Sequence, residues 1–182
     1  MKNYMLIIAI FLSQLFFAQE LAQKRLIEEY GDSYEIPFAE FKTDTLALLK
    51  VVFDVSRPSE NQQEPNEIFV AAARFLNMHY NAGANPNNLK IALVVHGAAA
   101  NDVLNTEAYL RRTATANNIV NTNVALLSAL AQEGVEIILC GQTAVYRDIK
   151  QHDVHQDVKF ALSAMTALMQ LQNEGYHLIN FN

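Results

Sequence analysis

Five short segments rich in β-branched and other apolar residues recur along this chain, and segments with helical spacing alternate with them. The expected strands are 49–55, 90–95, 135–140, 158–162 and 177–181, and the expected helices are 67–81, 121–132, 141–149 and 163–174. The unbroken apolar run 91–95 is typical of a strand buried on both faces. Alternating strands and helices form parallel sheets covered on both faces. We therefore predict a three-layer α/β/α domain with a mostly parallel, five-stranded sheet.

The amino terminus has the pattern of an export signal. Lys2 precedes the nearly continuous apolar run Tyr4–Phe17, and Ala18 suits a cleavage site. The run is short for a membrane span and has no charged stop after it, although a retained anchor is the alternative. We expect a signal peptide at 1–18 and a periplasmic or secreted domain at 19–182. Residues 19–47 form its amino-terminal arm, with a weak helical pattern up to Gly31.

Composition narrows the classes of partner. The apolar fraction of 51% is enough for a real core, and the formal net charge is -6. Nucleic acids and anionic membranes attract basic surfaces, so we expect neither as a partner once the signal is removed. The sequence has no Gly-rich phosphate loop and no Gly-x-Ser-x-Gly elbow, which argues against nucleotide-dependent and serine-hydrolase chemistry.

The single cysteine, Cys140, ends one expected strand, and His96 ends another. Ligands bind at the carboxyl ends of the strands in open parallel sheets, so both side chains are expected at one edge. A helix beginning after Cys140 would favour its thiolate, and Gly141 would leave the sulfur approachable. The alternative is a cysteine that packs as a small apolar residue.

His96 is followed by Gly97 and three alanines, which leave room for a ligand. The histidine would then orient or deprotonate the thiol, or bind an anion; the alternative is a core histidine bonded to a backbone carbonyl. His152 and His155 have a spacing seen in metal sites, but no third ligand is evident nearby, and we expect neither a metal nor an organic cofactor.

Several strings of residues are similar to the DsrE/DsrF-like family, which includes sulfur-relay subunits, and the exported members resemble this chain most. They are 51–55, 73–77, 93–97, 134–142, 161–168 and 172–176, including Cys140-Gly141-Gln142. The resemblance implies a parallel α/β/α sheet and oligomers built from trimers. It also implies a persulfide-carrying cysteine at Cys140, with His96, Gly97 and Gln142 lining its pocket. Together with the strand-end positions above, this makes Cys140 and His96 the expected catalytic residues. Gly97, Asn101, Gly141 and Gln142 are then expected to line the binding pocket.

Three functions follow from these observations. The first is a sulfur carrier or sulfurtransferase-like protein that uses Cys140, with a sulfur donor or acceptor protein as partner. The second is a non-catalytic, oligomeric module that binds a small molecule or anion. A Cys-His hydrolase is the weakest, because the sequence identifies no third residue to orient His96. Apolar residues of the helix 163–174 favour a homo-oligomer, or else a well-covered core helix: Met165, Leu168, Met169 and Leu171.

Overall fold

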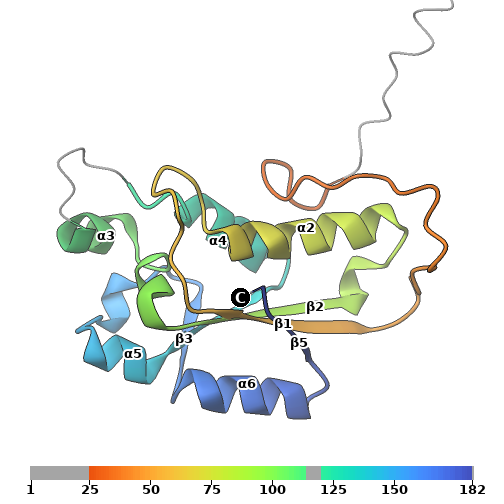
Figure 1. The fold of residues 1–182 in the computed structure, drawn as a ribbon. Coiled ribbons are helices and arrows are strands. Elements are labelled where there is room, and N and C mark those ends of the chain that lie inside the picture. Colours follow the sequence, from red (N-terminus) through yellow and green to blue (C-terminus); the bar gives the residue numbers. More distant parts are fainter. Residues whose placement is uncertain (1–24, 114–119, 182) are drawn as a thin grey trace, which may run out of the picture.

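The computed structural model describes residues 25–113 and 120–181, so the predicted signal peptide at 1–18 lies outside the described residues. Five strands form one sheet in the order β4-β3-β2-β1-β5, and every pair is parallel (Figure 1). The strands are β1 (Leu49–Val55), β2 (Leu89–Val95), β3 (Glu136–Cys140), β4 (Val158–Ala161) and β5 (His177–Ile179). The predicted α/β fold with its parallel five-stranded sheet is confirmed.

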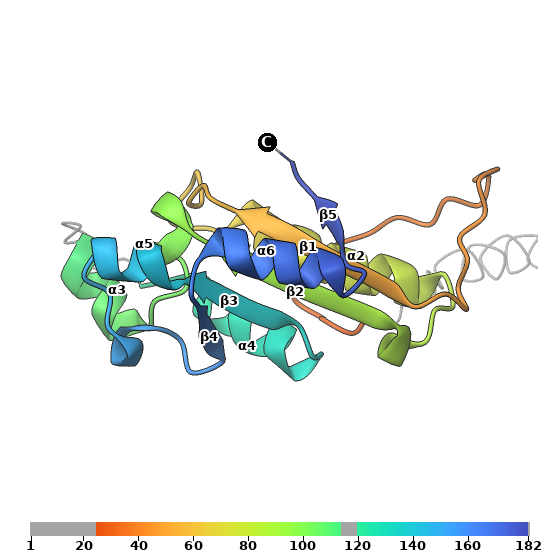
Figure 2. The same ribbon diagram turned by 90° about the horizontal axis from the view of Figure 1, so that it is seen from below.

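Helices cover both faces of the sheet (Figures 1 and 2). Helices α2 (Glu67–Asn81) and α4 (Val124–Gln132) pack on one face, and α6 (Ala164–Asn173) packs on the other. Alternation along each strand divides the core between the two faces. In β1, Phe53 belongs to the larger core under α2 and α4, whereas Val52 belongs to the smaller one under α6.

Local chemistry explains where the main helices begin. Asn66 caps α2 by accepting a hydrogen bond from the amide of Ile68, and Ser163 caps α6 by accepting one from Thr166. Helix α5 (Gly141–Tyr146) begins directly after β3, with Cys140 as its capping residue. No loop separates β3 from α5, so this cysteine is fixed at the carboxyl edge of the sheet.

Two segments differ from the expectation. Helix α3 (Thr106–Thr113) and a 3₁₀ turn at Gly97–Asn101 occupy a region for which the sequence suggested no element. Residues 26–30 form bends rather than a helix. The side chain of Asn77 on α2 bonds their backbone instead, accepting from Leu26 and Ile27 and donating to the carbonyls of Ile27, Tyr30 and Gly31.

The following segment, residues 32–48, has neither helix nor strand. From here on, the word arm refers to residues 32–48 alone and not to the whole predicted arm at 19–47. The arm runs around the amino end of β1 before entering that strand (Figure 1). Within the described residues, no helix has the length and apolar character needed to cross a bilayer.

Candidate functional site

Three reactive side chains lie at the carboxyl ends of three adjacent strands. β1 and β2 are paired up to Val55 and Val95, and Val95 is paired with Leu139 of β3. His96 and Cys140 each follow one residue later, and Asp54 precedes Val55. Because side chains alternate between faces, all three project toward the face that α6 covers. The expectation that His96 and Cys140 share one edge therefore agrees with the geometry.

The Cys140 sulfur lies where two helices begin. The residue is only 5% exposed, and the Thr143 amide donates to its sulfur over 3.5 Å. Burial raises the pKa of the Cys140 thiol, but hydrogen bonds from the Thr143 hydroxyl and from the amides of Thr143, Ala164 and Gln142 outweigh this effect. The resulting pKa is below the ordinary value of a cysteine. Since Gln142 and Thr143 belong to α5 and Ala164 opens α6, both helices favour the thiolate.

Thr143 connects the cysteine to the end of β2. Its hydroxyl oxygen accepts a hydrogen bond from the Gly97 amide over 3.3 Å, and its hydroxyl bonds the Cys140 sulfur. Gly97 has a φ of 58°, a left-handed conformation that favours glycine. Gly97 therefore acts on the site through its backbone. The sequence reasoning missed Thr143, although a hydroxyl three residues after a strand-end cysteine is the available signal.

Asp54 holds His96 in place. The Nε2 atom of His96 lies 2.8 Å from Oδ1 of Asp54, and both side chains are partly buried. A carboxylate only accepts hydrogen bonds, so Nε2 is the donor. Sequence reasoning missed Asp54, although it is the only acidic residue in the apolar strand 49–55. Among the described residues no hydrogen bond joins His96 to the Cys140 sulfur.

A pocket of about 350 Å³ opens in front of these groups. Asp54, His96, Cys140 and Gln142 contribute its polar part, and the start of α6 contributes a mostly apolar wall. That wall consists of Ser163, Ala164, Met165 and Leu168. Hence Cys140, His96 and Gln142 come together as expected.

Asn101 lies elsewhere. It lines a separate small cavity of about 90 Å³ beside Asp102 and Asn123, and its buried Oδ1 has no hydrogen-bond partner among the described residues. The 3₁₀ turn that follows Gly97 carries Asn101 away from the strand edge. It therefore does not contribute to the cysteine pocket.

Gly141 is required for close packing between β3 and β4. A Cβ atom at this position would lie 2.6 Å from the carbonyl oxygen of Ala161 in β4. That distance is shorter than real contacts, so glycine permits the close approach of β3 to β4.

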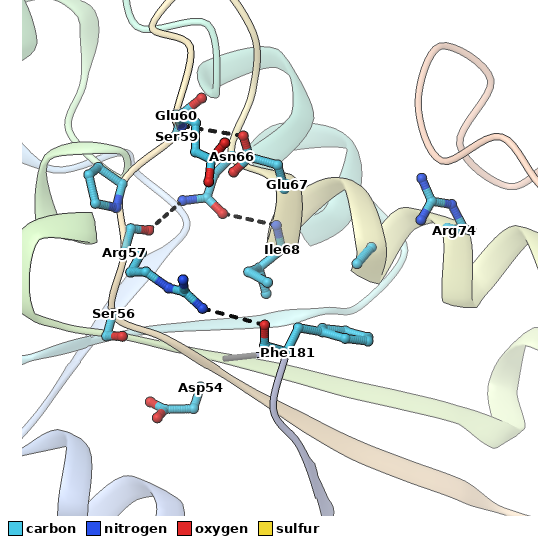
Figure 3. Close-up of a pocket in the computed structure, with 12 residues that line it drawn as sticks. Asp54, Ser56, Arg57, Ser59, Glu60, Asn66, Glu67, Ile68, Arg74 and Phe181 are labelled. Atoms are coloured by element: carbon cyan, nitrogen blue, oxygen red, sulfur yellow. Dashed lines mark hydrogen bonds between the residues drawn. The ribbon is translucent and has the colours of Figure 1, made fainter.

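A larger cavity, of about 560 Å³, lies on the α2 side of the same edge (Figure 3). Arg57 projects into it and donates to the carbonyl oxygen of Phe181 over 3.4 Å, while Glu67 and Arg74 come from α2. Asp54 lines both this cavity and the cysteine pocket. The two hollows are therefore neighbours around the end of β1.

The paired histidines of the sequence do not share one side. His152 is exposed, whereas His155 is buried with Nε2 3.0 Å from the Ser128 hydroxyl, and burial lowers the pKa of His155. The described part of the chain contains no group of three or more acidic, histidine or cysteine side chains arranged to hold a metal ion.

Comparison with known structures supports the fold. The MTH1491 protein of unknown function from Methanobacterium thermoautotrophicum matches with a TM-score of 0.52 and 17% identity, over 72% of this chain and 98% of that one. The ychN protein from E. coli matches with a TM-score of 0.51 and 16% identity, over 73% and 99%. At these identities the likeness establishes the fold alone. No curated protein gives a significant match to the chain.

The sequence itself gives the family assignment. The model of the DsrE/DsrF-like family matches residues 50–181, which include β1 except for Leu49, the other four strands, and Asp54, His96 and Cys140. The match covers more than half of the chain and begins just after the arm. The chain therefore belongs to the DsrE/DsrF-like family.

Proposed function

We propose that this protein is a sulfur carrier in which Cys140 receives and passes on sulfane sulfur. The observation that carries the proposal is the surroundings of Cys140: a single thiol that lines a pocket, accepts a hydrogen bond from the Thr143 amide, and has its pKa lowered by the Thr143 hydroxyl and neighbouring backbone amides. Membership of a family that includes sulfur-relay subunits supports the same chemistry.

The loading step balances without a cofactor. The Cys140 thiolate attacks the outer sulfur of a donor persulfide, R–S–SH. The sulfur–sulfur bond of the donor breaks, R–S⁻ leaves, and Cys140 becomes Cys–S–SH. An acceptor thiolate then removes the outer sulfur in the same way. A thiolate attacks far faster than a thiol, so a lowered Cys140 pKa favours this exchange.

Intact mass spectrometry of anaerobically purified protein tests the proposal. After incubation with polysulfide, the chain should gain one sulfur atom, which cyanide removes. Cys140→Ser should gain none while keeping the fold. His96→Asn should load more slowly if the imidazole assists the exchange. A Cys140 that stays unmodified and alkylates with an ordinary thiol pH profile would contradict the carrier function.

A small-molecule binding module is the second candidate, and the cavity on the α2 side favours it. Its volume of about 560 Å³ falls within the usual range for ligand sites. In that case a metabolite would bind beside Arg57 and Glu67, and Cys140→Ser would leave its affinity unchanged.

Export and assembly complete the proposal. We expect cleavage after Ala18, so that the mature chain begins near Gln19; recovery of uncleaved chain from membranes would indicate an anchor instead.

We also expect a homo-oligomer built from trimers. Exposed Met165 and Met169 on α6 support self-association, since burial of an apolar helix face is favourable.

A further inference from the structure

The arm carries an unusual set of exposed apolar side chains. Tyr34, Phe38 and Phe41 are 85%, 80% and 96% exposed. Ile36, Leu46 and Leu48 are also exposed. Exposed apolar residues are common singly, but a cluster of large ones marks an interaction surface.

The backbone of the arm is nevertheless held in place at both ends. At its start, the Arg74 guanidinium donates to the Asp32 carbonyl; near its end, the Asn88 amide donates to the Leu46 carbonyl. Asp44 accepts hydrogen bonds from the Leu46 and Ala47 amides, which shapes the last turn. The side chains between these points therefore face outward from a positioned segment.

A second exposed apolar surface lies on α6. Leu162 is 72% exposed, and Met165 and Met169 follow at a spacing that places both on one side of the helix. These three residues are called the methionine face. Residues 164–173 include no charged side chain. A second protein can therefore cover this helix without removing a charged group from water. Met165 also forms the rim of the cysteine pocket.

We propose that the arm of one copy of this chain packs on the methionine face of a second copy and closes the open side of its Cys140 pocket. One chain does not bring the two surfaces together, because the arm projects past the amino end of β1 whereas α6 lies across the sheet (Figures 1 and 2). The inference adds a defined contact to the proposed homo-oligomer and does not depend on the sulfur chemistry.

The available area fits a second protein copy. Aromatic side chains bury about 150–250 Å² each, so the three rings of the arm, which are 80–96% exposed, offer roughly 400–650 Å². A standard interface takes about 800 Å² per partner, which the three aliphatic residues of the arm help to reach. An anionic membrane is a poorer occupant, since residues 32–48 contain four carboxylates and one lysine.

Analytical ultracentrifugation of two variants tests the contact. In the arm variant, Phe38→Ser and Phe41→Ser remove two aromatic anchors; in the face variant, Met165→Lys and Met169→Lys place charges on α6. Each should weaken self-association by about tenfold or more, because few anchors carry most interface energy. Val120→Ser, an exposed change outside both surfaces, should leave association unchanged.

Mixing the variants identifies which surfaces meet. The arm variant keeps an intact methionine face, and the face variant keeps an intact arm. A mixture should therefore associate more strongly than either variant alone. Contacts of arm with arm, or of α6 with α6, would give no such recovery and would overturn the proposal. A monomeric wild type would also overturn the proposal, and so would an oligomer that stays intact in the arm variant. Neither result would affect the proposed sulfur loading of Cys140.

Discussion

The Thr143 hydroxyl is the side-chain group that most directly favours ionisation of Cys140. Thr143→Val keeps the shape of the residue and its amide but removes this hydrogen bond. We expect the Cys140 pKa to rise and alkylation at neutral pH to slow by about tenfold or more, the effect of one hydrogen bond to a charged group. The rate of iodoacetamide labelling across pH measures it.

Thr143→Ser is the matched control, because it retains the hydroxyl and should keep the wild-type profile. A pH profile of labelling that is identical in Thr143→Val and wild type would mean that the backbone amides alone lower the Cys140 pKa. The hydroxyl also accepts from the Gly97 amide, so the valine variant reports on both contacts.

Asp102 offers a second titration, away from the cysteine. Burial raises its pKa from 3.8 to about 6, despite hydrogen bonds from Asn66 and Ser59 that lower it. Between these pH values the folded chain binds the proton and the unfolded chain releases it. The free energy of unfolding should therefore fall as pH rises from about 4 to about 6, by about 3 kcal/mol in total from this group.

Asp102→Asn should abolish that contribution, because its amide oxygen can still accept from Ser59 and Asn66 but cannot ionise. Urea denaturation of both proteins at several pH values measures the difference. The variant should gain stability relative to wild type as pH rises through this window. A difference that stays constant from pH 4 to pH 7 would mean that the carboxyl group does not titrate there.

At the scale of the elements, the junction of β3 and α5 depends on the absence of a side chain. Gly141→Ala would place a methyl group against the Ala161 carbonyl, so β4 must move away from β3. We expect a loss of about 1–3 kcal/mol in the free energy of unfolding, as for other overpacked positions. Denaturant unfolding measures it, with the exposed neighbour Gln142→Ala as a control expected to change little. Equal stability of both variants would contradict this reading of the glycine.

These elements show which parts of the fold and of the site can be predicted from a single sequence. The strand 49–55, the helix 67–81 and the Cys140–Gly141 junction follow from patterns of apolar and small residues, which act locally. Asp54 and Thr143 become site residues only through neighbouring strands, and a single sequence does not display such pairings. Helix α3 was missed because only Ala108 and Tyr109 of its eight residues are buried, which leaves little apolar periodicity.

For the whole molecule, Asn77 joins the amino-terminal segment to the domain. Asn77→Leu preserves size but leaves five backbone groups of residues 26–31 without their partner. We expect that segment to detach while the sheet stays folded, since most of the core lies after residue 48. Limited proteolysis should cut near Tyr30 at least about tenfold faster, because local opening exposes the cleavage site.

The control for this test is Asn81→Leu, which loses only a marginal bond to Ser33. Cleavage near Tyr30 at the wild-type rate in Asn77→Leu would show that apolar packing of Ile27 is sufficient to hold the segment.

The place of β5 beside β1 has a consequence for how the chain is made. β1, the first of the described strands to be synthesised, pairs on one side with β2 and on the other with the last strand described. Until residues 177–179 emerge, β1 presents a free row of amides and carbonyls to any other extended chain. A nascent or carboxyl-terminally clipped molecule therefore exposes β1 as an unpaired strand edge, which is prone to pairing with the wrong chain.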